Sequence, residues 1–199
     1  MKGQERRAAR NREKIIQTAM VLFMSEGIKK VTVNDIALKA GFSPATVYNQ
    51  FGSKDKLVVE ALRLWADSVL DDFKKMLETG ESFEMKLQDI MAFKTDMAGK
   101  IHGEFLMAMA SNDPEVRKLF EEEYLGKLKQ HIYNFYDEGR EQGYIGHDLS
   151  TDTILRFTEI VRNGINAESK LSSDPYYTVN LLRDLTPIFL YGLVGKGKR

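Results

Sequence analysis

The 199-residue chain contains no cysteine, only four prolines and no long apolar run. The absence of cysteine excludes disulfide bonds, thiolate zinc sites, iron–sulfur clusters and cysteine nucleophiles. The scarcity of proline permits long helices. The longest uncharged apolar stretch, residues 185–195, is shorter than the roughly 20 residues that a membrane-spanning helix needs. We therefore expect no membrane span.

Six basic residues precede an apolar stretch near the N-terminus, an order that superficially resembles a signal peptide. However, Gln17 and Thr18 interrupt this stretch, and no small-x-small cleavage site follows it. Its apolar residues recur at the spacing of one helix face, namely Ile15, Ala19, Leu22 and Phe23. We therefore expect a folded helix here and a cytoplasmic protein.

Charge is balanced overall but unevenly distributed along the chain. Residues 1–64 hold 12 Lys/Arg against 6 Asp/Glu, whereas residues 65–199 hold 17 against 23. A basic module beside an acidic one suggests that only the first part meets a polyanion. The basic residues at the very start fit two interpretations, a flexible arm that neutralises phosphates or a solvated, frayed terminus.

Apolar spacing is helical nearly throughout, and no β-hairpin motif is present. The pattern predicts an all-α fold of about nine helices, over residues 8–26, 33–40, 44–51, 54–79, 83–99, 101–111, 114–142, 151–170 and 175–195. We place an N-terminal domain at residues 1–53, a connecting helix at 54–79 and a helical body at 80–199.

Residues 33–51 predict a helix-turn-helix. Thr32 and Asp35 have the spacing of a capping box before the first helix, and Ser43-Pro44 begins the second helix with a cap and a proline. Gly41 provides the tight turn between them. The second helix directs polar side chains outward, namely Ser43, Thr46, Asn49 and Gln50, while Val47 and Phe51 face inward. Such side chains suit the base edges of a major groove, although helix-turn-helix domains that never touch nucleic acid also exist.

The N-terminal segment R-E-K-I-I-Q-T-A-M-V-L-F-M-S-E-G and T-V-N-D-I-A-L-K-A-G-F-S-P-A-T-V-Y-N-Q-F-G-S-K-D-K-L resembles the DNA-binding domain of the tetracycline-repressor (TetR) family. The resemblance covers about a quarter of the chain, and the remainder matches only in length, helix count and acidic character. The matching positions are Ile16, Ala19, Phe23, Gly27, Thr32, Val33, Ile36, Ala37, Ala40, Gly41, Ser43, Thr46, Tyr48, Phe51, Ser53, Lys54 and Leu57.

The resemblance implies that Thr32, Tyr48 and Lys54 hold DNA phosphates. It also implies that one group of residues faces the groove: Ser43, Pro44, Ala45, Thr46, Asn49 and Gln50. Simpler roles remain open, because Tyr48 could pack on the first helix, Thr32 could act only as a cap and Lys54 could be an ordinary exposed lysine. Ala45 and Gln50 depart from residues frequent in the family, which leaves the preferred base sequence open.

The closing helices are candidates for dimerisation, because one short recognition helix buries too little surface for tight binding. The helix predicted over 151–170 carries a stripe with Ile154 at its start, and the last helix is apolar on nearly every side. The expected interface residues are Phe157, Val161, Gly164, Ile165, Ile188 and Tyr191. In the resembled family the corresponding helices form a four-helix dimer interface. An intramolecular core is the alternative.

The middle helices are rich in Met and aromatic residues, which suit adaptable apolar pockets but equally an ordinary core. The candidate ligand-binding residues are Met91, Lys94, Met97, Phe105, Met109, Phe120 and Tyr124. Lys94 falls on the inner face of its predicted helix, where it meets an anionic ligand or extends outward to solvent.

These features predict a ligand-responsive, sequence-specific DNA-binding regulator, a repressor released from a palindromic operator by a small apolar or amphipathic effector. The expected partners are double-stranded DNA with a pseudo-palindromic operator, the effector and a second copy of the chain, without a membrane. We expect no enzyme activity, metal or cofactor, because no phosphate loop, metal-binding or nucleophile motif is present. A helical small-molecule-binding protein and a nonspecific DNA binder that retain the same N-terminal fold are the alternatives.

Overall fold

The computed structural model describes residues 2–109, 111 and 113–167, together with positions 177, 180, 181, 183–185, 188 and 192. The chain divides into two compact units, Met1–Ser68 and Val69–Arg199. The division falls inside the helix α4 (Lys54–Glu78), so that each unit includes one part of this helix.

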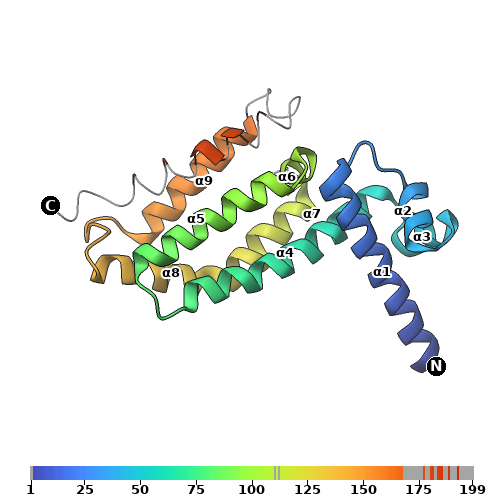
Figure 1. The fold of residues 1–199 in the computed structure, drawn as a ribbon, viewed down its shortest axis with the longest axis horizontal. Coiled ribbons are helices and arrows are strands. Elements are labelled where there is room, and N and C mark those ends of the chain that lie inside the picture. Colours follow the sequence, from blue (N-terminus) through green and yellow to red (C-terminus); the bar gives the residue numbers. More distant parts are fainter. Residues whose placement is uncertain are drawn as a thin grey trace. The chain divides into compact units, whose positions relative to one another are not determined.

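The first unit contains α1 (Lys2–Glu26), α2 (Val33–Ala40), α3 (Pro44–Phe51) and the first part of α4. The helix α2 contacts both α1 and α3, and Figure 1 shows these helices close together. The core contains apolar side chains of α1, α2 and α4 that are inaccessible to solvent, namely Ile15, Phe23, Ile36, Leu57 and Leu62, and α3 adds the buried Val47. This packing gives the helix-turn-helix segment a fixed frame.

Side-chain caps define the ends of α2 and α3. The predicted capping box is confirmed, because the Asp35 backbone N–H donates to the Thr32 hydroxyl while the Thr32 backbone N–H donates to the Asp35 carboxylate at 2.9 Å. Ser43 caps α3 by accepting a hydrogen bond from the Thr46 backbone N–H at 3.1 Å. Between the helices, Gly41 adopts a φ of 79°, a left-handed conformation that side chains with a Cβ disfavour.

The basic residues at the start of the chain continue α1. The helix begins at Lys2, and residues 3–10 are all exposed to solvent. Most residues in this stretch are Gln, Glu, Arg and Ala, which have high helix propensity. The six basic side chains of the N-terminus are therefore spaced along one helix.

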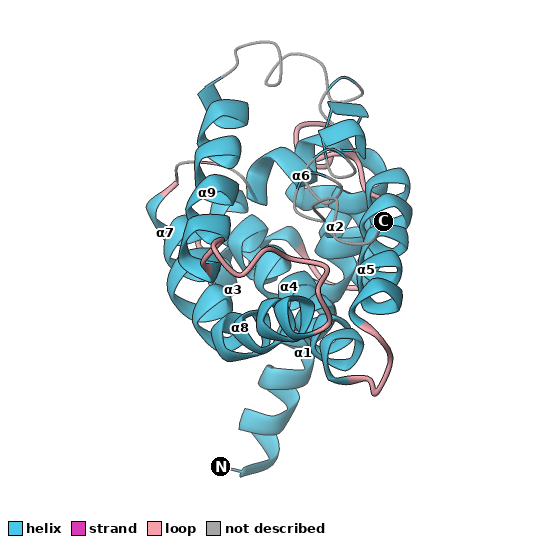
Figure 2. Ribbon diagram, turned by 90° about the vertical axis from the view of Figure 1, so that its left-hand side faces the viewer, coloured by secondary structure: helices cyan, strands magenta, loops and turns pink. Residues whose placement is uncertain are grey.

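The second unit contains the second part of α4, followed by α5 (Phe83–Lys100), α6 (Gly103–Met109), α7 (Pro114–Arg117), a π-helical segment η1 (Lys118–Tyr124), α8 (Leu125–Glu141) and α9 (Thr151–Ala167). The helix α8 contacts both α5 and α9, and Figure 1 shows α5 running alongside α8. Figure 2 shows that loops alone connect the drawn helices.

The core of the second unit joins α4, α5, α8, α9 and the loop that precedes α9. Its buried residues are Leu77, Phe83, Leu87, Ile90, Phe135, Tyr136, Ile145 and Ile154; we call them the body cluster. Partly buried residues that include Phe73 and Met91 pack against it. At its centre, Gly139 lies so close to Phe83 that an added Cβ would be 2.7 Å from the Phe83 ring.

The long helix predicted over residues 114–142 is interrupted. The segment η1 has π-helical hydrogen bonding, and α8 begins after it with no side-chain cap. A π-helical segment has no simple pattern of apolar residues, so the sequence did not reveal it. The helix predicted over 175–195 lies largely outside the described residues.

Two further properties concern only the described part of the chain. None of its helices combines the length and apolar character that crossing a membrane requires. The same residues contain no group of three or more His, Asp or Glu side chains arranged to hold a metal ion.

Candidate DNA-binding surface and ligand-binding region

The helix α3 presents one polar face to solvent. Val47 and Phe51 are buried against the first unit, as the sequence predicts, and this fixes the rotation of α3 about its axis. The opposite face holds the residues predicted to meet the groove. Of these, Ser43, Pro44, Ala45 and Asn49 are exposed, while Thr46 and Gln50 are half-buried.

Tyr48 and Lys54 are available for an external partner. The Tyr48 side chain is 51% exposed although it is aromatic, so its ring is not packed into the core. Lys54 is half-buried at the first position of α4, where backbone N–H groups of the first turn also lack helix partners. Neither side chain has a hydrogen bond or ion pair with a described residue. Both could therefore donate to a phosphate.

The two capping hydroxyls are already engaged within the protein. The Thr32 hydroxyl donates to Asp35 at 2.6 Å and accepts from its backbone N–H at 3.2 Å. The hydroxyls of Ser43 and Thr46 are 2.8 Å apart and form a hydrogen bond with one another. Contact with DNA by Thr32 would thus compete with its role in the capping box.

Gln50 differs from its expected place on the outer face. Its carboxamide oxygen is shielded from solvent and lacks a hydrogen-bond partner among the described residues, and the residue as a whole is half-buried. An unpaired buried oxygen is costly. Asn49, which is exposed, is therefore the better placed of the two amides for a base edge.

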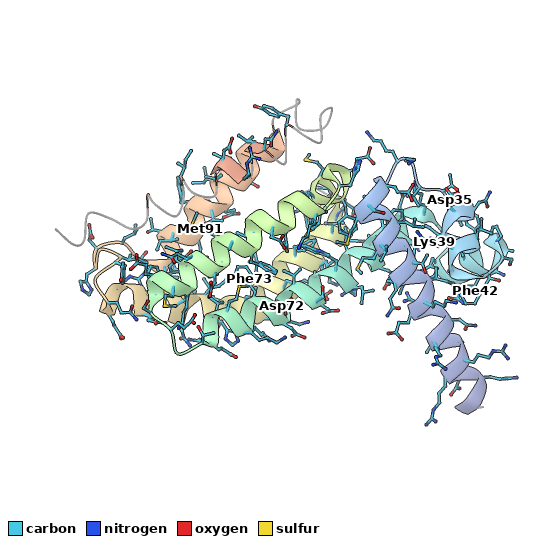
Figure 3. All side chains as sticks on the ribbon, in the orientation of Figure 1. Asp35, Lys39, Phe42, Asp72, Phe73 and Met91 are labelled. Atoms are coloured by element: carbon cyan, nitrogen blue, oxygen red, sulfur yellow. The ribbon has the colours of Figure 1, made fainter. Side chains whose placement is uncertain are left out.

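Two basic residues of α1 support α3. The Arg12 guanidinium pairs with Glu60 of α4 at 3.0 Å and lies 4.8 Å from the centre of the Phe51 ring. Lys14 lies 5.8 Å from the centre of the Phe42 ring, in the turn before α3; Figure 3 labels Phe42 in this unit. Their position in a basic run concealed this role in the sequence, where only the total charge was apparent.

The seven candidate ligand-binding residues have different environments in the second unit. Phe105 and Tyr124 are buried as parts of the core, and Lys94 is exposed. The remaining four, Met91, Met97, Met109 and Phe120, are half-buried. The Phe120 and Tyr124 rings lie 5.8 Å apart, on the π-helical segment.

The ammonium of Lys94 lies 5.9 Å from the centre of the Phe73 ring. Phe73 belongs to α4 and Met91 to α5, and Figure 3 labels both residues. Phe73 and Met91 both pack against the body cluster, so Lys94 lies at the margin of that core.

A recess of about 610 Å³ lies between α8 and α9. Leu125 and Ile132 of α8 and Leu155 of α9 provide apolar lining. Charges of both signs also line the recess, from Lys129, Arg156, Asp152 and Glu159. None of the seven candidate ligand-binding residues lines this recess.

The helix α9 carries an apolar stripe on its exposed side. Phe157 is 49% and Ile160 59% exposed, Val161 is half-buried, and the space around Gly164 is open. Ile154, which the sequence placed on this stripe, belongs instead to the body cluster. The sequence overlooked Ile160, although it lies three residues after Phe157.

Three of the expected interface residues fall at or beyond the end of α9. Ile188 is 68% exposed. Tyr191 and the side chain of Ile165 lie outside the described residues.

A helix-turn-helix unit with an exposed polar recognition helix, followed by a helical second unit, defines an all-α DNA-binding regulator. The family model described as "Bacterial regulatory proteins, tetR family" matches residues 15–61. Residues 15–61 therefore form a DNA-binding domain of the TetR family, and the protein is a DNA-binding transcriptional regulator.

Curated relatives extend the similarity beyond the first unit. The transcriptional repressor KstR2 of Mycolicibacterium smegmatis is 26% identical over 156 residues, which cover 75% of this chain and 74% of that protein. KstR2 of Rhodococcus jostii is 25% identical over 153 residues, or 73% of each chain.

Solved structures share the fold. A transcriptional regulator from Saccharomonospora viridis, in complex with choline, has a TM-score of 0.65 at 21% identity and covers 92% of this chain and 96% of its own. The regulator FadR of Bacillus subtilis, in complex with stearoyl-CoA, has a TM-score of 0.62 at 17% identity, with coverage of 94% and 99%.

Proposed function

We propose that the protein is a homodimeric repressor that binds a pseudo-palindromic operator and is released by a small apolar or amphipathic effector. The observation that carries the proposal is the exposed polar face of α3. Beside it lie two side chains that can donate hydrogen bonds to DNA phosphates, Tyr48 and Lys54. Repression is favoured by the curated relatives, which are named as repressors.

Direct base contacts are assigned to Asn49 first, because it is exposed on the α3 face. An asparagine side chain can both donate to and accept from an adenine edge in the major groove. Ser43, Pro44, Ala45 and Thr46 form the end of α3 that enters the groove, with Gln50 at its margin. Tyr48, Lys54 and Thr32 hold phosphates in this proposal, and the basic side chains along the start of α1 add attraction without sequence preference.

A dimer follows from the geometry of DNA. Two recognition helices must be about 34–36 Å apart to enter successive major grooves. The exposed stripe of α9 supports a two-fold interface, because Phe157 and Ile160 would lose apolar exposure and Gly164 would allow close helix approach. Ile165, Ile188 and Tyr191 remain proposed members of this interface.

The effector is assigned to the second unit. Its half-buried methionines and aromatic residues support an adaptable apolar site, and two solved structures of the same fold were determined with a small molecule bound. An effector that binds better to one spacing of the two recognition helices would shift the dimer away from DNA.

Selection of binding sites from a random pool of duplexes tests the proposal. The expected result is one near-palindromic site whose binding weakens steeply as salt rises, because phosphate contacts release counterions. Sedimentation at the same concentrations should give a dimer, and Phe157→Asp should give a monomer that loses the site. A shallow salt response without a preferred sequence would contradict the proposal and favour a nonspecific binder or a small-molecule carrier.

A further inference from the structure

Lys94 is the lysine of α5 that has no charged partner among the described residues. The helix has three lysines, and the other two form ion pairs of 2.6 Å, Lys86 with Glu138 and Lys100 with Asp96. Among the described residues, Lys94 has no ion pair or hydrogen bond. Its ammonium instead lies over the ring of Phe73.

The surroundings of Lys94 are apolar. Met91 and Met97, three residues before and after it on α5, are half-buried, and Ile90 one turn earlier is buried. The Phe73 ring beneath the ammonium meets the Phe93 ring edge-on at 6.2 Å between centres. A cation is attracted to an aromatic face, but this attraction does not replace the hydration of an ammonium.

An ordinary lysine that extends to solvent would keep its usual pKa. Neighbouring protein atoms partly bury the ammonium, and this burial lowers the pKa of Lys94. The residue as a whole nevertheless keeps exposed surface. An ammonium that is partly surrounded by protein atoms and still reaches solvent can pair with a ligand that enters from solvent.

The body cluster contains a second polar group among apolar side chains, the hydroxyl of Tyr136. Tyr136 is only 9% exposed, and its hydroxyl has no hydrogen-bond partner among the described residues. Burial raises its pKa to about 12, so the phenol stays protonated and can donate. Phe73, which contacts Lys94, packs against the cluster to which Tyr136 belongs.

We propose that the effector carries a negatively charged group, which pairs with the Lys94 ammonium while its apolar part lies on Met91, Met97 and Phe73. This assignment rests on the proposed effector function of the second unit. A carboxylate or sulfonate on an apolar body has the required chemistry, because an anion that pairs with the ammonium replaces the hydration that its apolar neighbours displace. A neutral effector would leave the ammonium without compensation.

Two fluorescent probes with the same aromatic rings test the proposal: anilinonaphthalene sulfonate, which is anionic, and N-phenylnaphthylamine, which lacks the sulfonate. The full-length protein should bind the sulfonate more tightly than the neutral probe. Lys94→Met should weaken sulfonate binding about tenfold or more and leave neutral-probe binding unchanged. Lys94→Arg, which keeps the charge, should retain most of the sulfonate affinity.

The matched control is Lys100→Met, which removes a lysine with a partner from the same helix and should change neither affinity. Circular dichroism must show the same helix content and melting temperature for all variants. The proposal is overturned if the wild-type protein does not bind the sulfonate, or if Lys94→Met affects both probes equally or neither.

DNA binding by the same proteins separates this proposal from the proposed function. Lys94→Met should bind the selected operator as the wild type does, and the sulfonate should release the wild type at lower concentration than the variant. If the wild type has no preferred DNA site, the regulator proposal is contradicted, whereas a difference in affinity between the two probes would still support the anionic ligand at Lys94. Sulfonate binding that never releases the operator would contradict the assignment of Lys94 to the effector.

Discussion

The two units of the chain differ in how regularly their helices begin and in how fully their large apolar side chains are buried. In the first unit, α2, α3 and α4 each begin with a side-chain cap, from Thr32, Ser43 and Ser53 respectively. In the second, Ser82, Asp113 and Ser150 cap α5, α7 and α9, but α8 begins after a π-helical segment without a cap, and several large apolar side chains near it are only half-buried. The difference suits a fixed surface for DNA and an adaptable body for a ligand.

Removal of a large core side chain should damage the first unit most. Phe23 is fully buried between the helices of this unit, so Phe23→Ala should lower the free energy of unfolding by about 3–5 kcal/mol. Urea denaturation followed by circular dichroism measures the loss. Leu38→Ala is the control, because Leu38 is 83% exposed, and it should change stability by less than about 0.5 kcal/mol. Equal losses in both variants would contradict the described core.

In the second unit, the tightest packing is at Gly139. An added methyl would meet Phe83 at 2.7 Å and Ile145 at 2.9 Å, so Gly139→Ala should destabilise the protein by about 1–3 kcal/mol. Gly126 lies on the same helix with open space around its Cβ position. There the same substitution should be neutral or stabilising by up to about 1 kcal/mol, since alanine favours a helix. Thermal melting of the two variants compares them directly, and a stable Gly139→Ala would show that α5 and α8 are not closely packed.

The capping box separates a structural from a DNA-binding role for Thr32. Thr32→Ala should cost about 1 kcal/mol of stability, whereas Thr32→Asn, which keeps a capping oxygen, should cost little. Chemical denaturation gives these differences. If operator affinity follows stability across the two variants, the cap explains Thr32. A Thr32→Asn protein of normal stability that binds DNA weakly would instead assign Thr32 to a phosphate.

The smallest effect concerns acid stability. Hydrogen bonds from the Thr32 side chain and backbone hold the pKa of Asp35 below its ordinary value of 3.8. The ionised carboxylate therefore stabilises the folded state above that value, and this contribution is lost as pH falls through the lower folded-state pKa. The stability difference between the wild type and Asp35→Asn, measured between about pH 5 and about pH 2, should shrink at the acid end. A difference that stays constant with pH would contradict the hydrogen bonds.

The local structure of the first unit was largely predictable. The spacing of Thr32 and Asp35 and the Ser43-Pro44 step have direct physical consequences within a few residues, so they fixed the starts of α2 and α3. The four-residue spacing of Val47 and Phe51 likewise predicted which face of α3 is buried. The extent of α1 was underestimated because propensity alone, without packing, supports its exposed first residues.

Features that depend on contacts between distant residues were not predictable. The burial of the Gln50 oxygen and the membership of Ile154 in the body cluster depend on contacts with other elements, which the apolar spacing of a single helix does not specify. The position of Lys94 over Phe73 requires α5 and α4 to lie side by side, which periodicity does not specify. The role of Arg12 in holding Glu60 and Phe51 was hidden for the same reason.

The most direct test of the account compares Asn49→Ala and Lys54→Ala on a library of operators derived from the selected site. Lys54→Ala should weaken binding to all sequences about equally and reduce the salt dependence by about one phosphate contact per half-site. Asn49→Ala should relax the base preference at one position in each half-site, at a cost of about 1–3 kcal/mol for the preferred base. If Asn49→Ala lowers affinity uniformly, with the base preferences unchanged, then the exposed face of α3 does not contact the bases and the central assignment is wrong.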